Sequence, residues 1–318
     1  MYLLVSTREK VNLSICSQDA KELKALLAND DRINIVQSSG DPAALDPLKV
    51  EVLLASPNLA AQCVSLCNQL TWLQSTWAGN TPLVSLEKRD YTLTVAGGIF
   101  ETQIREYVFT YILNHVRKVF EIEEQANKGP TWQSVLPNYL SGKTLGILGT
   151  GSLAQALIPV AQVFGLNVIG LSRTGKNITG FNQVFTLEDK LLLAEQADFV
   201  VSLLPDTAQT THLLDNEFFQ AMKFDSLLIN AGRGNVIDEQ ALIDNLARKK
   251  PSKAVLDVFE QEPLPSSHPF WYSDHIHITH HTAAISRVED VVDLFLKNVD
   301  RYINGQPLHC QLDWNKGY

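Results

Sequence analysis

The 318 residues are enough to bury a large core, and we expect two domains. The net charge of −9 and the lack of a long basic block argue against a nucleic-acid partner or a membrane surface. No apolar run reaches transmembrane length and the N-terminal one is too short for a signal peptide, so we expect a cytoplasmic protein. Cys16, Cys63, Cys67 and Cys310 form no Cys-x-x-Cys, which favours buried thiols over a metal site.

The first hundred residues have the pattern of a small α/β unit. Apolar runs predict strands at 2–6, 33–37, 50–55 and 71–75, and helical spacing predicts helices at 19–28 and 58–70, with Asn58 as a candidate N-cap. This alternation indicates a flavodoxin-like parallel sheet. Strand 71–75 runs into Thr76-Trp77-Ala78-Gly79, at the strand end where open α/β sheets bind ligands. The backbone N–H groups of that turn suit a small carboxylate, although an ordinary strand-to-loop exit has the same residues.

A long helix is predicted from Glu101 to about Ala126, followed by a loop at 128–139. The strongest motif of the chain comes next, at 144–174. A strand at 145–148, a glycine turn, a helix at 153–164 and a strand at 167–171 follow one another within about 30 residues.

The residue types in the glycine turn suit a dinucleotide. Gly149 permits a sharp turn, Gly151 lets a pyrophosphate approach the backbone, and Ala154 lets the helix lie close to the strand. The pyrophosphate then binds the free N–H groups at the helix N-terminus. The predicted cofactor contacts in this turn are Gly149, Thr150, Gly151, Ser152 and Leu153.

The end of the second strand indicates which dinucleotide binds. An NAD site usually has an acidic residue there, whereas this chain has Ser172-Arg173-Thr174 and then Lys176. An arginine and two hydroxyl groups bind a 2′-phosphate, so we predict NADPH in preference to NADH. The alternative is that Arg173 and Lys176 belong to a solvated loop.

The rest of the chain continues the alternation. Strands are predicted at 198–204, 226–230, 253–257 and 276–279, and helices at 187–197, 216–222, 238–249 and 290–304. Arg233, Glu262 and His281 lie just beyond the ends of three of these strands. Parallel strands end on the same side of a sheet, so these side chains are expected to converge on the nicotinamide.

The chemistry of these three residues suits the reduction of a 2-oxo acid. His281 can donate a proton to a carbonyl oxygen as hydride arrives at the carbon, and Glu262 can accept from the other ring nitrogen and favour the protonated imidazole. Arg233 can bind the carboxylate and polarise the carbonyl. Taken singly, the three also fit a surface turn, a loop carboxylate and a core histidine.

As a set, the segments GILGTGSLA, LLPDTAQTTHLL, LINAGRGNVIDEQAL, LDVFEQEPLP and ITHHTAAIS resemble the D-isomer-specific 2-hydroxyacid dehydrogenases, over nearly the whole chain. The segments LQSTWAGN and DWNKGY are most similar to the glyoxylate- and hydroxypyruvate-reducing branch of that family. The resemblance implies two doubly wound domains. A Rossmann NAD(P)-binding domain at 102–283 is inserted into a flavodoxin-like substrate domain at 1–101 and 284–318, so that the last helix packs on the first.

The resemblance also implies residue roles. Arg233, Glu262 and His281 are the expected catalytic set, and Trp77, Ala78, Gly79 and Arg233 the expected substrate site. Ala78 and Gly79 donate N–H groups to the substrate carboxylate, and Asp257 orients the nicotinamide carboxamide. Besides the glycine turn, the expected cofactor contacts are Ser172, Arg173, Thr174, Leu204, Pro205, Ala231, Arg233, Asp257 and His281.

The expected protein is thus a homodimeric, NADPH-dependent reductase of small 2-oxo acids, with the long helix in the dimer interface. The sequence departs from the family at His280, where proline is common, so His280 is a second candidate for the proton donor. Trp77 is bulkier than the residue often found in that turn, which either narrows the pocket toward small acids or moves the preference to another acid. A reductase of a bulkier 2-keto acid is one alternative. A dinucleotide sensor without catalytic activity is the remaining alternative.

Overall fold

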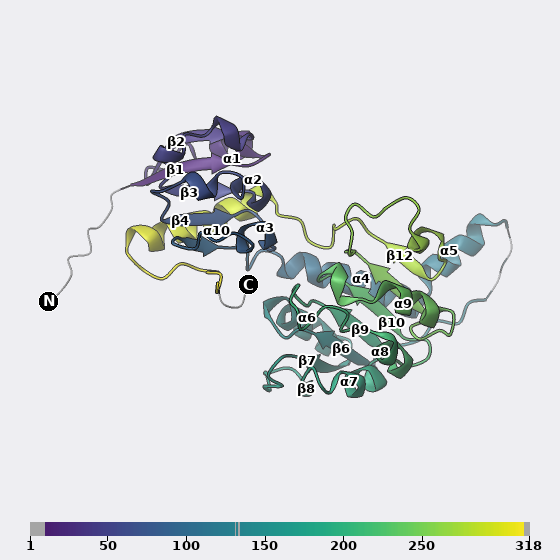
Figure 1. Ribbon diagram of the computed structural model, residues 1–318. Helices are drawn as coiled ribbons and strands as arrows, with labels where there is room; N and C mark the ends of the chain where they lie inside the picture. The colour runs from purple at the N-terminus through teal and green to yellow at the C-terminus, as the bar shows by residue number, and fades with distance from the viewer. Residues whose placement is uncertain (1–9, 131, 133, 315–318) are drawn as a thin grey trace. The chain divides into compact units, whose positions relative to one another are not determined.

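The computed structural model describes residues 10–130, 132 and 134–314 (Figure 1). The chain forms two compact units: the first runs to Ile99 and resumes at Ser286, and the second spans Phe100–Ile285. The boundaries expected from the sequence, after residues 101 and 283, lie within two residues of these.

The first unit is built on a five-stranded parallel sheet. Its strands are β1 (Val11–Cys16), β2 (Ile33–Ser39), β3 (Val52–Ala55), β4 (Trp72–Ser75) and β5 (Thr92–Thr94), in the order β2-β1-β3-β4-β5. This is the flavodoxin-like order, so the predicted fold of this unit is confirmed.

Helices cover both faces of this sheet. They are α1 (Ala20–Leu27), α2 (Pro57–Ala60), α3 (Thr81–Val84) and α10 (Val288–Ile303). The apolar sides of α1 and α10 pack together over one face, where the Phe295 ring stacks on Trp72 at 5.0 Å between centroids. The C-terminal helix therefore completes the core of the first unit, because its apolar stripe is buried there.

Strand β1 and the segment at 58–70 differ from what the sequence predicts. Strand β1 was not predicted, although Val11, Leu13 and Ile15 alternate with polar residues; the expected strand at 2–6 lies outside the described residues. The helix expected at 58–70 is wrong. The segment forms only the short α2 and a 3₁₀ turn at Val64–Leu66, because the three-residue spacing of a 3₁₀ turn also directs Val64 and Cys67 into the core.

The second unit contains a seven-stranded parallel sheet. Its strands are β6 (Thr144–Leu148), β7 (Asn167–Leu171), β8 (Gln183–Phe185), β9 (Phe199–Ser202), β10 (Leu227–Asn230), β11 (Lys253–Leu256) and β12 (Ile276–Ile278), in the order β12-β11-β10-β9-β6-β7-β8. The strand order reverses between β6 and β9, as in a Rossmann fold, and ligands of such sheets bind at this reversal.

Helices of the second unit are α4 (Glu101–Arg117), α5 (Val119–Asn127), α6 (Ser152–Val163), α7 (Lys190–Gln196), α8 (Asn216–Ala221) and α9 (Glu239–Leu246). In Figure 1, α4 lies near α6, whereas α7, α8 and α9 contribute to one common core. The described part of the chain also has 3₁₀ turns at Pro42–Ala44, Pro47–Lys49, Gly234–Val236 and Pro269–Tyr272. No helix in the described ranges is long and apolar enough to cross a membrane.

The single helix predicted from 101 to about 126 is wrong in one respect. Lys118 adopts a left-handed conformation, with φ of 58°, and divides the segment into α4 and α5. Asn114 stabilises the break: its carbonyl accepts from the Lys118 N–H and its side-chain oxygen accepts from the Phe120 N–H at 2.9 Å. The apolar spacing continues through the break, so the sequence pattern does not reveal it.

Candidate active site

The glycine turn follows β6 at the reversal of strand order. Gly149 has φ of 94°, a left-handed conformation that favours glycine, and its N–H donates to the Leu171 carbonyl at 2.9 Å. A Cβ at Gly149 would lie 3.3 Å from the Leu203 carbonyl oxygen, whereas a Cβ at Gly151 would have no neighbour within 4 Å. Gly149 is thus required by the turn itself, and Gly151 leaves open space beside the backbone.

Helix α6 presents unpaired donors at this turn. Gly151 is its N-cap, and in the described ranges no hydrogen bond uses the N–H groups of Ser152, Leu153 and Ala154. Ala154 is buried with 1% exposure, as expected where the helix approaches the sheet. Twelve residues of helix orient their dipoles toward this end, so the turn is suited to bind an anion.

The segment after β7 carries an exposed cluster of donors. Arg173, Thr174 and Lys176 are exposed, and Ser172 is partly buried and accepts from the Gly175 N–H at 3.2 Å. In the described part of the chain, neither Arg173 nor Lys176 forms an ion pair with an acidic residue. Two cations without acidic partners and two hydroxyl groups form a site that suits a phosphate.

The ends of β9 and β10 lie beside the glycine turn. Leu204 is buried and Pro205 partly buried, and the Pro205 carbonyl accepts from the Thr210 hydroxyl at 2.7 Å. The Ala231 N–H donates to the Ser202 carbonyl at 3.1 Å, and a Cβ on Gly232 would lie 2.7 Å from the Leu204 carbonyl oxygen. These two strand ends therefore approach each other as closely as their backbones allow.

Arg233 follows this close contact. Gly234 has no room for a Cβ, which would lie 1.9 Å from the Phe259 carbonyl carbon, so the Arg233 turn lies directly against the segment after β11. Burial lowers the pKa of the Arg233 guanidinium, and the charges of Glu262 and Asp206 partly oppose this effect. A half-buried arginine near two carboxylates keeps its positive charge and can bind an anion.

The structure brings Glu262 and His281 together, as predicted. The Nδ1 atom of His281 lies 2.7 Å from the Glu262 Oε2 atom, and Glu262 Oε1 accepts from the Phe259 N–H at 3.0 Å. The His281 side chain is 51% exposed, so its other ring nitrogen is accessible to a ligand. This contact orients the ring, as a proton donor requires. The His280 side chain is also exposed, but its ring lies 5.9 Å from that of Trp271.

Asp257 has contacts that the sequence did not reveal. Its carboxylate is buried and accepts from the N–H groups of Thr282 and Ala283, at 2.8 and 3.0 Å, and from the Thr279 hydroxyl. Its carbonyl accepts from the His281 N–H at 2.8 Å. Asp257 therefore holds the turn that carries His281, whose φ of 55° is left-handed. The Tyr107 hydroxyl, 2.8 Å from that of Thr279, extends this network to α4.

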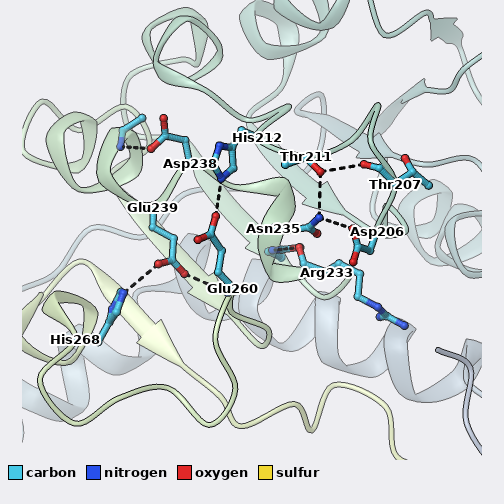
Figure 2. Close-up of polar contacts among 12 residues, drawn as sticks. Asp206, Thr207, Thr211, His212, Arg233, Asn235, Asp238, Glu239, Glu260 and His268 are labelled. Atoms are coloured by element: carbon cyan, nitrogen blue, oxygen red, sulfur yellow. Dashed lines mark hydrogen bonds and ion pairs between the residues drawn. The ribbon is translucent and has the colours of Figure 1, made fainter. Parts of the chain in front are cut away.

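A second polar network, shown in Figure 2, was also missed by sequence reasoning. The Asn235 side-chain amide donates to Asp206 and to the Thr211 hydroxyl. His212 contacts Glu260, and His268 contacts Glu239 at 3.0 Å. The Arg233 guanidinium points away from this network in Figure 2. The network ties together the loops after β9, β10 and β11, and its residues are ordinary loop residues that no motif singles out.

The turn after β4 belongs to the first unit. Trp77 is 41% exposed, Ala78 is exposed, and Gly79 is partly buried. Within the described residues, the N–H groups of Ala78 and Gly79 make no hydrogen bond. The turn therefore has two adjacent free donors at the carboxyl end of the sheet, as the predicted carboxylate site requires.

Taken together, the Rossmann sheet with its glycine turn and the paired histidine and glutamate define an NAD(P)-dependent oxidoreductase. The family model described as "D-isomer specific 2-hydroxyacid dehydrogenase, NAD binding domain" matches residues 109–283, more than half of the chain. The chain belongs to the D-isomer-specific 2-hydroxyacid dehydrogenase family.

Individual relatives agree with this assignment. A glyoxylate/hydroxypyruvate reductase A of Yersinia enterocolitica is 31% identical over 243 residues, 76% of this chain and 74% of the relative. A crystal structure of a family member from Aeromonas salmonicida is 38% identical, covers 96% of this chain and 99% of that one, and has a TM-score of 0.87. An NADPH-dependent glyoxylate/hydroxypyruvate reductase of Sinorhizobium meliloti, in complex with NADP and sulfate, is 25% identical, with a TM-score of 0.84 and coverage of 97% and 100%.

Proposed function

We propose that this protein reduces small 2-oxo acids, such as glyoxylate and hydroxypyruvate, to 2-hydroxy acids with NADPH. The observation that carries the proposal is the His281–Glu262 contact of 2.7 Å beyond the strand ends of a dinucleotide-binding sheet. Two of the relatives described above are named for glyoxylate and hydroxypyruvate, which supports this substrate class.

In the proposed mechanism, the nicotinamide supplies hydride to the carbonyl carbon when the cofactor is bound. His281 donates a proton to the carbonyl oxygen, and Glu262 keeps the ring oriented. Arg233 binds the substrate carboxylate and polarises the carbonyl, and its burial strengthens this interaction.

Further residues contact the substrate and the cofactor in the proposed function. The Ala78 and Gly79 N–H groups bind the substrate carboxylate, and Trp77 limits the size of the substrate. The glycine turn binds the pyrophosphate, with Leu204, Pro205 and Ala231 beside it. Asp257 holds the His281 turn and orients the nicotinamide carboxamide.

The preference for NADPH rests on Ser172, Arg173 and Thr174. The Arg173→Ala variant should weaken NADPH binding about tenfold or more, as loss of a charge-assisted hydrogen bond does, and NADH binding much less. Fluorescence titration of both cofactors measures this difference. Equal losses for the two cofactors would show that Arg173 does not contact the phosphate.

The choice of proton donor is tested by a matched pair of variants. His281→Asn should lower kcat at least about 100-fold, as expected for loss of a general acid, and leave the Kd for NADPH nearly unchanged. His280→Asn is the control, because its exposed ring does not contact Glu262, and it should keep wild-type activity. The reverse result would transfer the proton-donor role to His280.

The substrate class is tested by rates of NADPH and NADH oxidation with glyoxylate, hydroxypyruvate, pyruvate and a bulky 2-keto acid. Fast oxidation of NADPH with the two-carbon and three-carbon acids is expected. Activity with the bulky acid alone would reject the proposed substrate class. NADPH binding without turnover of any acid would indicate a dinucleotide sensor.

We also propose a cytoplasmic homodimer. Phe120 and Ile122 on α5 are 41% and 46% exposed, and Trp132 and Leu136 in the following segment are 98% and 89% exposed. Contiguous exposed apolar patches mark interaction sites, and we propose that these four side chains form one between two copies of the chain. Sedimentation equilibrium should give a dimer for the wild type and a monomer for the Trp132→Glu/Leu136→Glu variant. A monomeric wild type at micromolar concentration would contradict this.

The four cysteines are free thiols, as expected in a reducing compartment.

A further inference from the structure

We propose that Asn80 is the positioning residue of the carboxylate site: it orients the N–H groups of Ala78 and Gly79 by binding the carbonyl groups of Trp77 and Ala78. This inference rests on the proposed function, because the substrate carboxylate is the ligand of those N–H groups. It adds a residue to the site and gives a physical reason for the asparagine that follows Trp77-Ala78-Gly79.

The contacts of Asn80 are made with the turn itself. Its side-chain Nδ2 atom donates to the Trp77 carbonyl and to the Ala78 carbonyl, both at 3.1 Å. The residue is 5% exposed, so these bonds are shielded from water. One buried amide group therefore binds two consecutive peptide carbonyls.

The geometry of the peptide bond converts these contacts into the orientation of two donors. In a planar trans peptide, the C=O of one residue and the N–H of the next point in opposite directions. Holding the Trp77 carbonyl toward Asn80 turns the Ala78 N–H away from it. Holding the Ala78 carbonyl does the same for the Gly79 N–H. Both N–H groups are thus directed away from Asn80, toward the exposed side of the turn.

The two peptides differ in how much they depend on Asn80. The Trp77 carbonyl has two further donors, the Ser75 hydroxyl and the Ala96 N–H, each at 3.1 Å. In the described part of the chain, the Ala78 carbonyl accepts from Asn80 alone. The orientation of the Gly79 N–H therefore depends mainly on Asn80, whereas that of the Ala78 N–H is fixed by three donors to the Trp77 carbonyl.

The chemistry at position 80 requires a donor. An aspartate has nearly the same shape but cannot donate to the two carbonyls, and its negative charge would repel a substrate carboxylate. A leucine has a similar volume and removes the donors without adding charge. The Asn80 Oδ1 atom is buried and has no partner among the described residues, so neither variant breaks a bond made by that oxygen.

The experiment compares Asn80→Leu and Asn80→Asp with the wild type, with Asn68→Leu as an exposed control in the same unit. The kcat and KM for glyoxylate and the Kd for NADPH are measured for each protein, and melting curves verify that it is folded. We expect both Asn80 variants to raise the KM about tenfold, the range for one lost hydrogen bond to a charged group. The Kd for NADPH should stay within about twofold of the wild type, because the cofactor contacts predicted above lie in the other unit.

The outcomes separate orientation from other effects. An unchanged KM in both variants, or a raised KM in Asn80→Asp alone, would overturn the proposal, because the second result indicates charge repulsion without a role for the donors. If Asn80→Leu is unfolded, Asn80→Ala replaces it as the uncharged variant without donors: a raised KM supports lost orientation, and an unchanged KM overturns the proposal.

If the wild type reduces no 2-oxo acid, the proposed function fails, and calorimetric titration with oxalate tests the inference separately. Weaker oxalate binding by Asn80→Leu than by the wild type supports the inference. Equal binding, or no binding by the wild type, overturns it.

Discussion

Replacing Gly151 by alanine should separate cofactor binding from stability. Gly151 has φ of −72° and ψ of −168°, which any residue adopts, and an added Cβ meets nothing within 4 Å. Alanine is a poorer N-cap residue than glycine, which lowers the unfolding free energy by about 0.5–1 kcal/mol. It also lowers the entropy of the unfolded chain, which stabilises the fold by about 0.4–1 kcal/mol. These effects nearly cancel, so the free energy of unfolding should change by less than about 0.5 kcal/mol.

The same Cβ occupies the space that a pyrophosphate needs beside the backbone. Loss of one or more N–H bonds to a charged phosphate costs about 1.5–3 kcal/mol, which weakens NADPH binding about 10-fold to 150-fold. Urea unfolding measures the stability, and fluorescence titration measures the Kd.

Gly149→Ala is the matched control for this experiment. At φ of 94° and with a Cβ 3.3 Å from the Leu203 carbonyl oxygen, alanine is strained, so the unfolding free energy should fall by about 1–3 kcal/mol. If Gly151→Ala bound NADPH as tightly as the wild type, the pyrophosphate could not lie at this turn. A large loss of stability in Gly151→Ala would refute the assignment of open space.

Two further predictions concern α4. Tyr107→Phe removes the hydrogen bond to the Thr279 hydroxyl and should lower the unfolding free energy by about 1 kcal/mol, which urea unfolding measures. Steady-state rates should show a smaller loss of kcat than in His281→Asn. An unchanged stability would show that this bond contributes nothing. Burial, and to a smaller extent the positive charge of Lys118, lowers the pKa of His115 below its ordinary value of 6.5. The unfolded chain therefore binds a proton that the folded chain does not, and stability falls as pH drops through about 6.5. His115→Gln should reduce the loss of melting temperature between pH 7.5 and 5.5; an identical loss would exclude His115 as a source.

Much of the second unit follows from local sequence. Strand β7 has the predicted bounds, Asn167–Leu171, and β6, α6, β10 and β11 lie within one or two residues of their predicted positions. These segments are short apolar runs bounded by glycine or polar residues, so their period and their ends are visible in the sequence. The His281–Glu262 contact was also predictable, because parallel strands end on the same side of a sheet.

The predictions failed where packing between distant segments decides the local structure. Strands β5 and β8, of three residues each, are too short to show a pattern, and they form because a neighbouring strand offers free hydrogen-bonding groups. The break at Lys118 depends on the side chain of Asn114. The 3₁₀ turn at Val64–Leu66 depends on the burial of Val64 and Cys67 in the core of the first unit.

The sequence by itself determined the fold class and the glycine turn, and it singled out Arg233, Glu262 and His281 as candidates, because these depend on residue type and on the order of short periodic segments. Only the tertiary structure decided the contacts around these residues. The bonds of Asp257 to the turn that carries His281, and those of Asn80 to the Trp77 and Ala78 carbonyls, cannot be read from residue type or spacing. The physical reason is that a hydrogen bond depends on distances of about 3 Å and on direction, which are set when the packed backbone brings side chains and turns together.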